Sequence, residues 1–136
     1  MAALSIDATL VLASTGKTGG VAKAGAAITA GQVGYIADGN IFQLADANGT
    51  PPLNVPTCVA LNGGSTNQPI SYATEDPTFT PGFTVLAGDT IWLSPTAGGM
   101  TKTIGDLVAG CTVSVLGVMK TTTTMKLKIV TGGAVA

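Results

Sequence analysis

The residue types that most often carry out covalent catalysis are scarce in this chain of 136 residues. It contains no His, so the Ser–His and Cys–His pairs that activate a nucleophile cannot form. Its only Glu, Glu75, is followed directly by Asp76. Neighbouring residues on a strand point to opposite faces, so we expect these carboxylates not to converge on one substrate and interpret them as part of a solvated loop at residues 74–81. The sequence therefore predicts that the protein is not an enzyme.

Metal and cofactor sites find equally little support in the sequence. Cys58 and Cys111 have no His and no second Cys nearby, which argues against a zinc site by ligand count. Residues 46–49 offer oxygen ligands but lack the spaced acidic series and the Glu of a calcium loop. The Gly-Lys-Thr run at residues 16–18 ends like a phosphate-binding loop, but Val11 stands where that motif requires Gly. We expect no metal and no cofactor.

The two cysteines allow two interpretations. Free Cys is among the most buried residue types, which favours two buried thiols, whereas a long-range disulfide between Cys58 and Cys111 is the alternative. We prefer the thiols, because the first residues lack the basic and continuous apolar regions of an export signal and Asp7 interrupts them. No run of about 18 uncharged apolar residues is present, so we expect no membrane span and synthesis in the cytoplasm.

The composition favours a protein that works in contact with a larger surface. Charged residues make up 10% of the chain, whereas a typical soluble domain has about a quarter. Because like-charge repulsion helps to keep proteins apart, a surface so poor in charge is weakly protected from association. Six lysines, no Arg and a net charge of −1 leave little electrostatic basis for binding phosphate groups, so we expect no nucleic-acid partner.

Short β-branched runs separated by turn residues predict an all-β fold. Three segments share one pattern, in which an Ala-Gly pair that can supply a positive-φ turn precedes a β run. These pairs are Ala30-Gly31, Ala87-Gly88 and Ala109-Gly110. Further turns are expected at residues 38–40, 62–67 and 97–99, and a final hairpin should join residues 113–119 to 125–130. We predict a small single-domain β-barrel or β-sandwich, jelly-roll or tulip-like in form, with a Gly-rich N-terminal arm.

The expected arm comprises residues 1–25 and the compact all-β domain residues 26–136. The arm is rich in Gly from residue 16 onwards and should need outside support to hold regular structure. Before the glycines, apolar residues recur with the period of a strand: Leu4, Ile6, Ala8, Leu10 and Leu12. Two interpretations of residues 4–12 stay open. They form either an arm that pairs with an exposed strand edge of a partner or an ordinary first strand of the domain.

The order of these segments resembles that of the head decoration, or capsid cement, proteins of tailed bacteriophages. The similarity covers about residues 26–130 and lies in the order of the pieces, since each piece alone is ordinary turn chemistry. The pieces are Ala-Gly-Gln-Val-Gly-Tyr at residues 30–35, Gln-Leu-Ala-Asp-Ala at 43–47, Val-Ala-Leu-Asn-Gly at 59–63, Gln-Pro-Ile at 68–70, Leu-Ala-Gly-Asp-Thr at 86–90, Leu-Ser-Pro-Thr-Ala-Gly-Gly-Met at 93–100 and Val-Ser-Val-Leu-Gly-Val at 113–118.

The resemblance implies a structural protein on the capsid exterior of the virion, made in the host cytoplasm. Such a protein binds the major capsid protein, commonly as a homotrimer, and stabilises the head by bridging neighbouring capsid subunits. Leu4, Ile6, Leu10 and Leu12 would then be the apolar anchors on the shell, and many copies would add up weak contacts.

A β-domain of a virion fibre, a tail or a surface adhesin, which binds a host receptor or glycan, is the alternative. Ala-, Gly- and Thr-rich β-domains serve in those proteins too. Trp92 is the only Trp and could stack on a sugar, but its apolar neighbours favour a place in the core. Lys126 and Lys128 alternate on the last expected strand and should face water.

Overall fold

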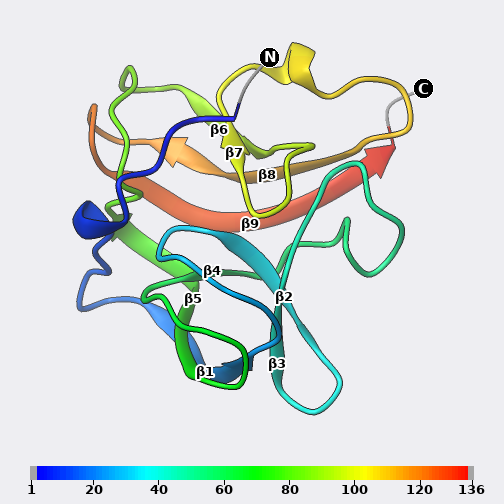
Figure 1. Cartoon of the computed structure of the whole chain (residues 1–136). Helices are drawn as coiled ribbons and strands as arrows, with labels where there is room; N and C mark the ends of the chain where they lie inside the picture. The colour runs from blue at the N-terminus through cyan, green and yellow to red at the C-terminus, as the bar shows by residue number, and fades with distance from the viewer. Residues whose placement is uncertain (1–2, 135–136) are drawn as a thin grey trace.

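The computed structural model describes residues 3–134 and consists almost entirely of strands, turns and loops (Figure 1). Over those residues it has nine strands, two short 3-10 turns and no α-helix. The strands are β1 (Thr18–Ala24), β2 (Val33–Ala37), β3 (Ile41–Leu44), β4 (Cys58–Ala60), β5 (Pro69–Phe79), β6 (Thr90–Leu93), β7 (Met100–Thr101), β8 (Thr112–Met119) and β9 (Met125–Ala134). The 3-10 turns are η1 (Ala8–Leu10) and η2 (Ile104–Asp106). The predicted all-β class is confirmed.

Five of the strands close into a small barrel. Their order is β1-β3-β2-β4-β5, and β5 pairs back with β1, so the ring is complete. The pairing of β1 with β3 is parallel and the other four are antiparallel. The remaining strands extend the sheet from β5 in the order β9-β8-β6-β7. In Figure 1 the barrel strands lie in the lower part of the molecule and β8 and β9 cross above them. The fold is thus a barrel with an open four-stranded extension.

The three Ala-Gly pairs form the positive-φ turns that the sequence predicts. Gly31, Gly88 and Gly110 have φ angles of 92°, 90° and 93°. Each is followed two residues later by the first residue of a strand, namely β2, β6 and β8. A residue with a Cβ is strained at such angles, which explains why Gly stands at all three positions.

The expected hairpins are also present. Residues 38–40 join β2 to β3, with positive φ angles of 86° at Gly39 and 61° at Asn40. Residues 97–99 lie between β6 and β7, which pair through Leu93 and Met100. The final hairpin joins β8 to β9 and reaches further than predicted, because Thr112 pairs with Ala134.

The prediction of a solvated loop at residues 74–81 is wrong for most of that range, because the strand β5 continues to Phe79. The second half of β5 pairs with β9, Glu75 with Lys128 and Asp76 with Leu127. An irregularity in the pairing between Asp76 and Phe79 accommodates Pro77, as a proline within a sheet requires. The prediction that the two carboxylates point to opposite faces is confirmed, since Glu75 is exposed and Asp76 is fully buried.

The Gly-rich segment differs from the arm expected at residues 1–25, because β1 is a strand of the barrel. It pairs with β5 over six residues and with the start of β3 on its other edge, which supplies the support that its glycines need. At Gly19 an added Cβ would lie 1.9 Å from the backbone oxygen of Tyr72 on β5. The barrel therefore begins at Thr18, before the predicted boundary at residue 25.

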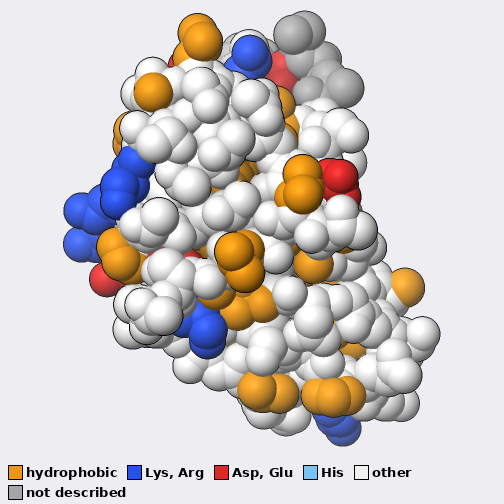
Figure 2. Space-filling view, turned by 90° about the vertical axis from the view of Figure 1, so that its left-hand side faces the viewer, with side chains coloured by type: hydrophobic (Ala, Val, Ile, Leu, Met, Phe, Trp, Pro, Cys, Tyr) orange, Lys and Arg blue, Asp and Glu red, His pale blue; other side chains and the backbone are white. Residues whose placement is uncertain are grey.

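Uncharged groups cover most of the face that carries η1. Figure 2 views the side that carries η1 and shows hydrophobic side chains in separate groups near the middle, surrounded by uncharged atoms. Lysines gather along the left margin of the same view. Lys126 and Lys128 on β9 are both exposed, as predicted.

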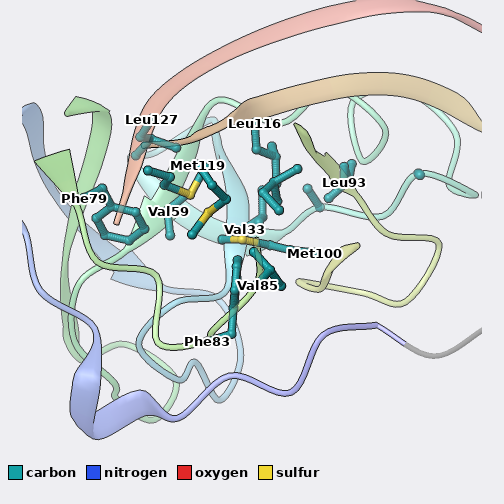
Figure 3. Close-up of a cluster of buried hydrophobic side chains, with 14 of the residues drawn as sticks. Val33, Val59, Phe79, Phe83, Val85, Leu93, Met100, Leu116, Met119 and Leu127 are labelled. Carbon is teal, nitrogen blue, oxygen red and sulfur yellow. The ribbon is translucent and has the colours of Figure 1, made fainter. Parts of the chain in front are cut away.

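The core consists of two hydrophobic clusters. The smaller one is formed by the barrel strands and includes Phe42, Cys58 and Ile70. The larger one joins the barrel to the extension, and Figure 3 shows its labelled side chains, which come from β2, β4, β5, β6, β7, β8, β9 and the chain between β5 and β6, packed into one group. Trp92 is partly buried and packs against this larger cluster.

Cys58 and Cys111 are both free and fully buried, so the buried-thiol interpretation is confirmed and the disulfide alternative is wrong. They lie in different clusters, Cys58 in the smaller and Cys111 in the larger. Burial raises the pKa of the Cys58 thiol to about 11, against a weaker opposing effect of the Thr57 hydroxyl. At neutral pH Cys58 is therefore protonated and unreactive.

We expect no reaction of the native protein with a thiol reagent such as DTNB at pH 8, because both thiols are buried and the reactive form of Cys58 is present only as the pH approaches 11. In denaturing urea both cysteines should react at the rate of a free thiol. Release of the thiolate chromophore, followed with and without urea, measures this directly. Rapid labelling of Cys58 in the folded protein would contradict the assigned burial.

Candidate docking surface

The segment before β1 is fastened to the body at several points. The Leu4 amide donates to the Met100 oxygen at 2.8 Å, and the Asp7 amide donates to the Gly82 oxygen at 2.8 Å. Leu12 and Thr80 exchange two backbone hydrogen bonds, at 3.0 and 2.9 Å. Its path therefore follows the edge of β7 and the chain that leaves β5.

The turn η1 interrupts the segment because Asp7 caps it. The Asp7 carboxylate accepts hydrogen bonds from the Thr9 amide at 3.0 Å and from the Thr9 hydroxyl at 2.6 Å. These two bonds lower the pKa of Asp7, so the cap stays ionised at neutral pH. Between Asp7 and Val11 the backbone is helical rather than extended, which ends the strand-like alternation that the sequence predicts.

As a result, the four predicted anchor residues do not share one face. Leu4 and Ile6, together with Val11, pack against the larger core cluster. Leu10 and Leu12 point outward and are 58% and 66% exposed. The predicted single apolar face is therefore wrong: the first two residues hold the segment in place and the last two are presented to solvent.

A buried carboxylate fixes the end of this segment. Asp76 is fully buried and accepts hydrogen bonds from the Ser14 amide at 2.8 Å, from the Ser14 hydroxyl and from the Thr78 amide at 3.0 Å. The sequence predicts a loop at Asp76 and gives no indication of this role. Its position immediately before Pro77, with Thr78 next, gave no local sign that a distant Ser would be its partner.

Beside Leu10 lies a largely apolar cleft of about 270 Å³. Phe83 contributes to its lining, is itself 8% exposed, and in Figure 3 its side chain reaches toward the buried cluster. The complete lining is Leu10, Thr80, Gly82, Phe83, Thr84 and Thr123. We call Leu10, Leu12 and this cleft the leucine surface. None of its residues is ionisable, so its chemistry is that of apolar contact bordered by hydroxyl groups.

Two further hollows lie elsewhere. One, of about 300 Å³, is bounded by the N-terminal segment and two loops, and its lining contains no ionisable residue. The other, of about 410 Å³, is lined by Tyr35, Ile36, Ala37, Asp38 and Pro52. Across residues 3–134 no three side chains of His, Cys, Asp or Glu gather as metal ligands would, and no helix is long and apolar enough to cross a membrane.

Three further acidic side chains make short-range bonds in turns. Asp46 accepts from the Asn48 amide at 2.9 Å and Asp89 from the Leu86 amide at 3.2 Å. Asp106 accepts from the Thr101 hydroxyl at 2.6 Å. These carboxylates therefore stabilise loops, which is a common use of Asp.

No protein-family model matches the chain, and no curated protein matches its sequence.

Proposed function

We propose that this protein is a structural component of a bacteriophage virion that binds the outer surface of the capsid and stabilises it by bridging neighbouring major capsid subunits. One observation carries the proposal: two exposed leucines are held on a fastened segment beside an apolar cleft that has no ionisable lining. Large apolar side chains exposed together in this way mark surfaces that are covered by a partner.

The anchoring of the segment favours tight contact. Leu4 and Ile6 pack inward, and Leu12 is bridged to Thr80, so Leu10 and Leu12 are presented on backbone that is already ordered. A preorganised surface loses little conformational entropy on binding. The low charge of the chain further limits the cost of removing water from the contact.

The symmetry of a shell strengthens such contacts. In the proposed assembly the protein is a homotrimer, as in the decoration proteins that its sequence resembles, with each leucine surface turned toward the capsid. Three linked contacts bind far more strongly than one, because the second and third binding steps are intramolecular. In this role the protein needs no cofactor and no nucleic acid, and it performs no catalysis.

The proposal predicts saturable binding of the purified protein to expanded, undecorated phage capsids, with a fixed number of copies per shell and greater heat resistance of the particle. The double variant L10S/L12S should bind at least about tenfold more weakly, because it removes two apolar side chains from the contact. Co-sedimentation with capsids measures the affinity.

Val21→Ser is the matched control, since Val21 is 56% exposed but lies on β1, away from the leucine surface. Its binding should equal that of the unmodified protein. Equal binding by L10S/L12S would overturn the assigned surface. Specific binding to a host glycan, with no affinity for capsids, would instead favour the adhesin alternative.

A further inference from the structure

Three lysines lie on one face of the hairpin formed by β8 and β9. Lys126 and Lys128 are two residues apart on β9 and are both exposed, so they share its outer face. Lys126 pairs across the ladder with Val118, which is 44% exposed on the same side. Lys120 follows β8 two residues after Val118 and is also exposed. We call Lys120, Lys126 and Lys128 the lysine rim.

The lysine rim adjoins the cleft of the leucine surface through the turn at residues 120–124. Thr123 in this turn is part of the cleft lining, and the Thr122 oxygen accepts from the Val85 amide at 3.0 Å, two residues after Phe83. The Lys120 ammonium donates to the Pro77 oxygen at 3.0 Å and to the Thr78 hydroxyl at 2.9 Å. Lys120 is therefore held close to Thr80, where the cleft begins.

Few acidic groups offset these lysines. Glu75, on the exposed side of β5, is the cross-strand neighbour of Lys128. Asp76 is buried and accepts from Ser14 and Thr78, so it does not face the lysines. Three of the six lysines of a chain with net charge −1 therefore lie on the hairpin whose turn contributes Thr123 to the apolar cleft. This arrangement produces a positive potential beside an uncharged pocket.

We infer that the segment of the partner that occupies the cleft carries one large apolar side chain flanked by carboxylates. A dry apolar cavity of about 150 Å³ holds a benzene molecule, so the cleft of about 270 Å³ has room for one Phe, Leu or Met side chain. Carboxylates on either side of that anchor would reach Lys120 and Lys126. The inference rests on the proposed function for the identity of the partner, the capsid subunit, but not for the chemistry of the contact.

A second copy of this chain fits the surface less well. A two-fold contact would place the same surface against itself, and the acid beside the leucine surface, Asp7, already accepts hydrogen bonds from the Thr9 amide and hydroxyl rather than from a lysine of the other copy. Unpaired lysines at such a contact would oppose association.

The experiment records amide NMR spectra of ¹⁵N-labelled protein with three synthetic peptides. The first has a central Phe flanked on both sides by Asp and Glu, the second has Ser in place of Phe, and the third has Lys in place of the acids. Only the first should shift the amides of Leu10, Phe83 and Thr123, and raising the salt to 1 M should weaken its binding at least about threefold, because the Debye length falls to about 3 Å.

The variant K120Q/K126Q should bind the acidic peptide about tenfold more weakly, whereas K23Q/K102Q, which removes two exposed lysines outside the rim, should bind it normally. Equal binding of all three peptides, shifts confined to other residues, or concentration-dependent dimerisation through the cleft would overturn the inference. The outcomes separate the two proposals. If capsid binding depends on Leu10 but not on the lysines, the inference about carboxylates is wrong and the proposed function stands. If the acidic peptide binds but capsids do not, only the proposed function is wrong.

Discussion

Replacing Asp76 with Ala is expected to lower the free energy of unfolding by about 3 kcal/mol, a large fraction of the stability of a small domain. The carboxylate is fully buried and accepts from the Ser14 amide, the Ser14 hydroxyl and the Thr78 amide. Its removal leaves these donors without their partner in a region that little water reaches. Such unpaired donors cost more than the lost hydrogen bonds themselves.

Urea unfolding followed by Trp92 fluorescence measures this effect. The matched control is Glu75→Ala, which removes the neighbouring carboxylate from the exposed face of the same strand and should be nearly neutral. Asp76→Asn keeps an acceptor and should fall between the two. If Asp76→Ala is no less stable than Glu75→Ala, the buried hydrogen bonds do not have the assigned role.

The same variant should loosen the segment that carries Leu10 and Leu12. The hydrogen bonds from Ser14 to Asp76 attach this segment to the body just before β1. Without them, the chain between Leu12 and Thr18 is free to move. We expect this variant to bind capsids more weakly, because the segment that carries the leucines must then become ordered on binding and loses conformational entropy. Limited proteolysis should cut this variant before β1 earlier than it cuts Glu75→Ala.

The second large effect is expected for Gly19→Ala, which should destabilise the protein by at least about 3 kcal/mol. An added Cβ would lie 1.9 Å from the Tyr72 oxygen and 2.9 Å from the Tyr72 carbonyl carbon. Both are backbone atoms of β5, so the clash cannot be relieved by a side-chain rotation. β1 and β5 must move apart, which opens the ring of five strands.

Gly133→Ala provides the control for this substitution. Gly133 also lies on a strand, β9, but an added Cβ there meets no heavy atom within 4 Å. Thermal unfolding should place Gly133→Ala close to the unmodified protein and Gly19→Ala far below it. Equal midpoints for the two variants would show that β1 is a detachable arm rather than a strand of the barrel.

The parts of the fold that depend on local chemistry could be predicted from the sequence. The three Ala-Gly turns and the turn at residues 38–40 follow from backbone angles that only a few residue types adopt easily. A barrel is one of the two predicted forms, but the strands that close it could not be predicted, because closure depends on which distant strands pair. The glycines of β1 are expected to need outside support, but the sequence does not show that β5 and β3 supply it by holding them in a ladder.

The candidate site shows the same division. Alternation indicates Leu10 and Leu12, which are exposed, but it does not show that Asp7 and Thr9 form a capped turn after which Leu4 and Ile6 point inward. The Asp7-x-Thr9 spacing was the available signal, since Asp often accepts from the amide two residues on. The sequence does not indicate a role for Phe83, because its cleft is formed by segments that are distant in sequence.

In the proposed function, the leucine surface is the face by which this protein attaches to a phage shell. Electron microscopy of expanded, undecorated capsids mixed with the purified protein tests it most directly. We expect added density on the outside of the shell, with η1 and the cleft beside Leu10 against the capsid subunits. Saturated capsids on which the leucine surface faces solvent, or shells that carry no added density at any protein concentration, would contradict it.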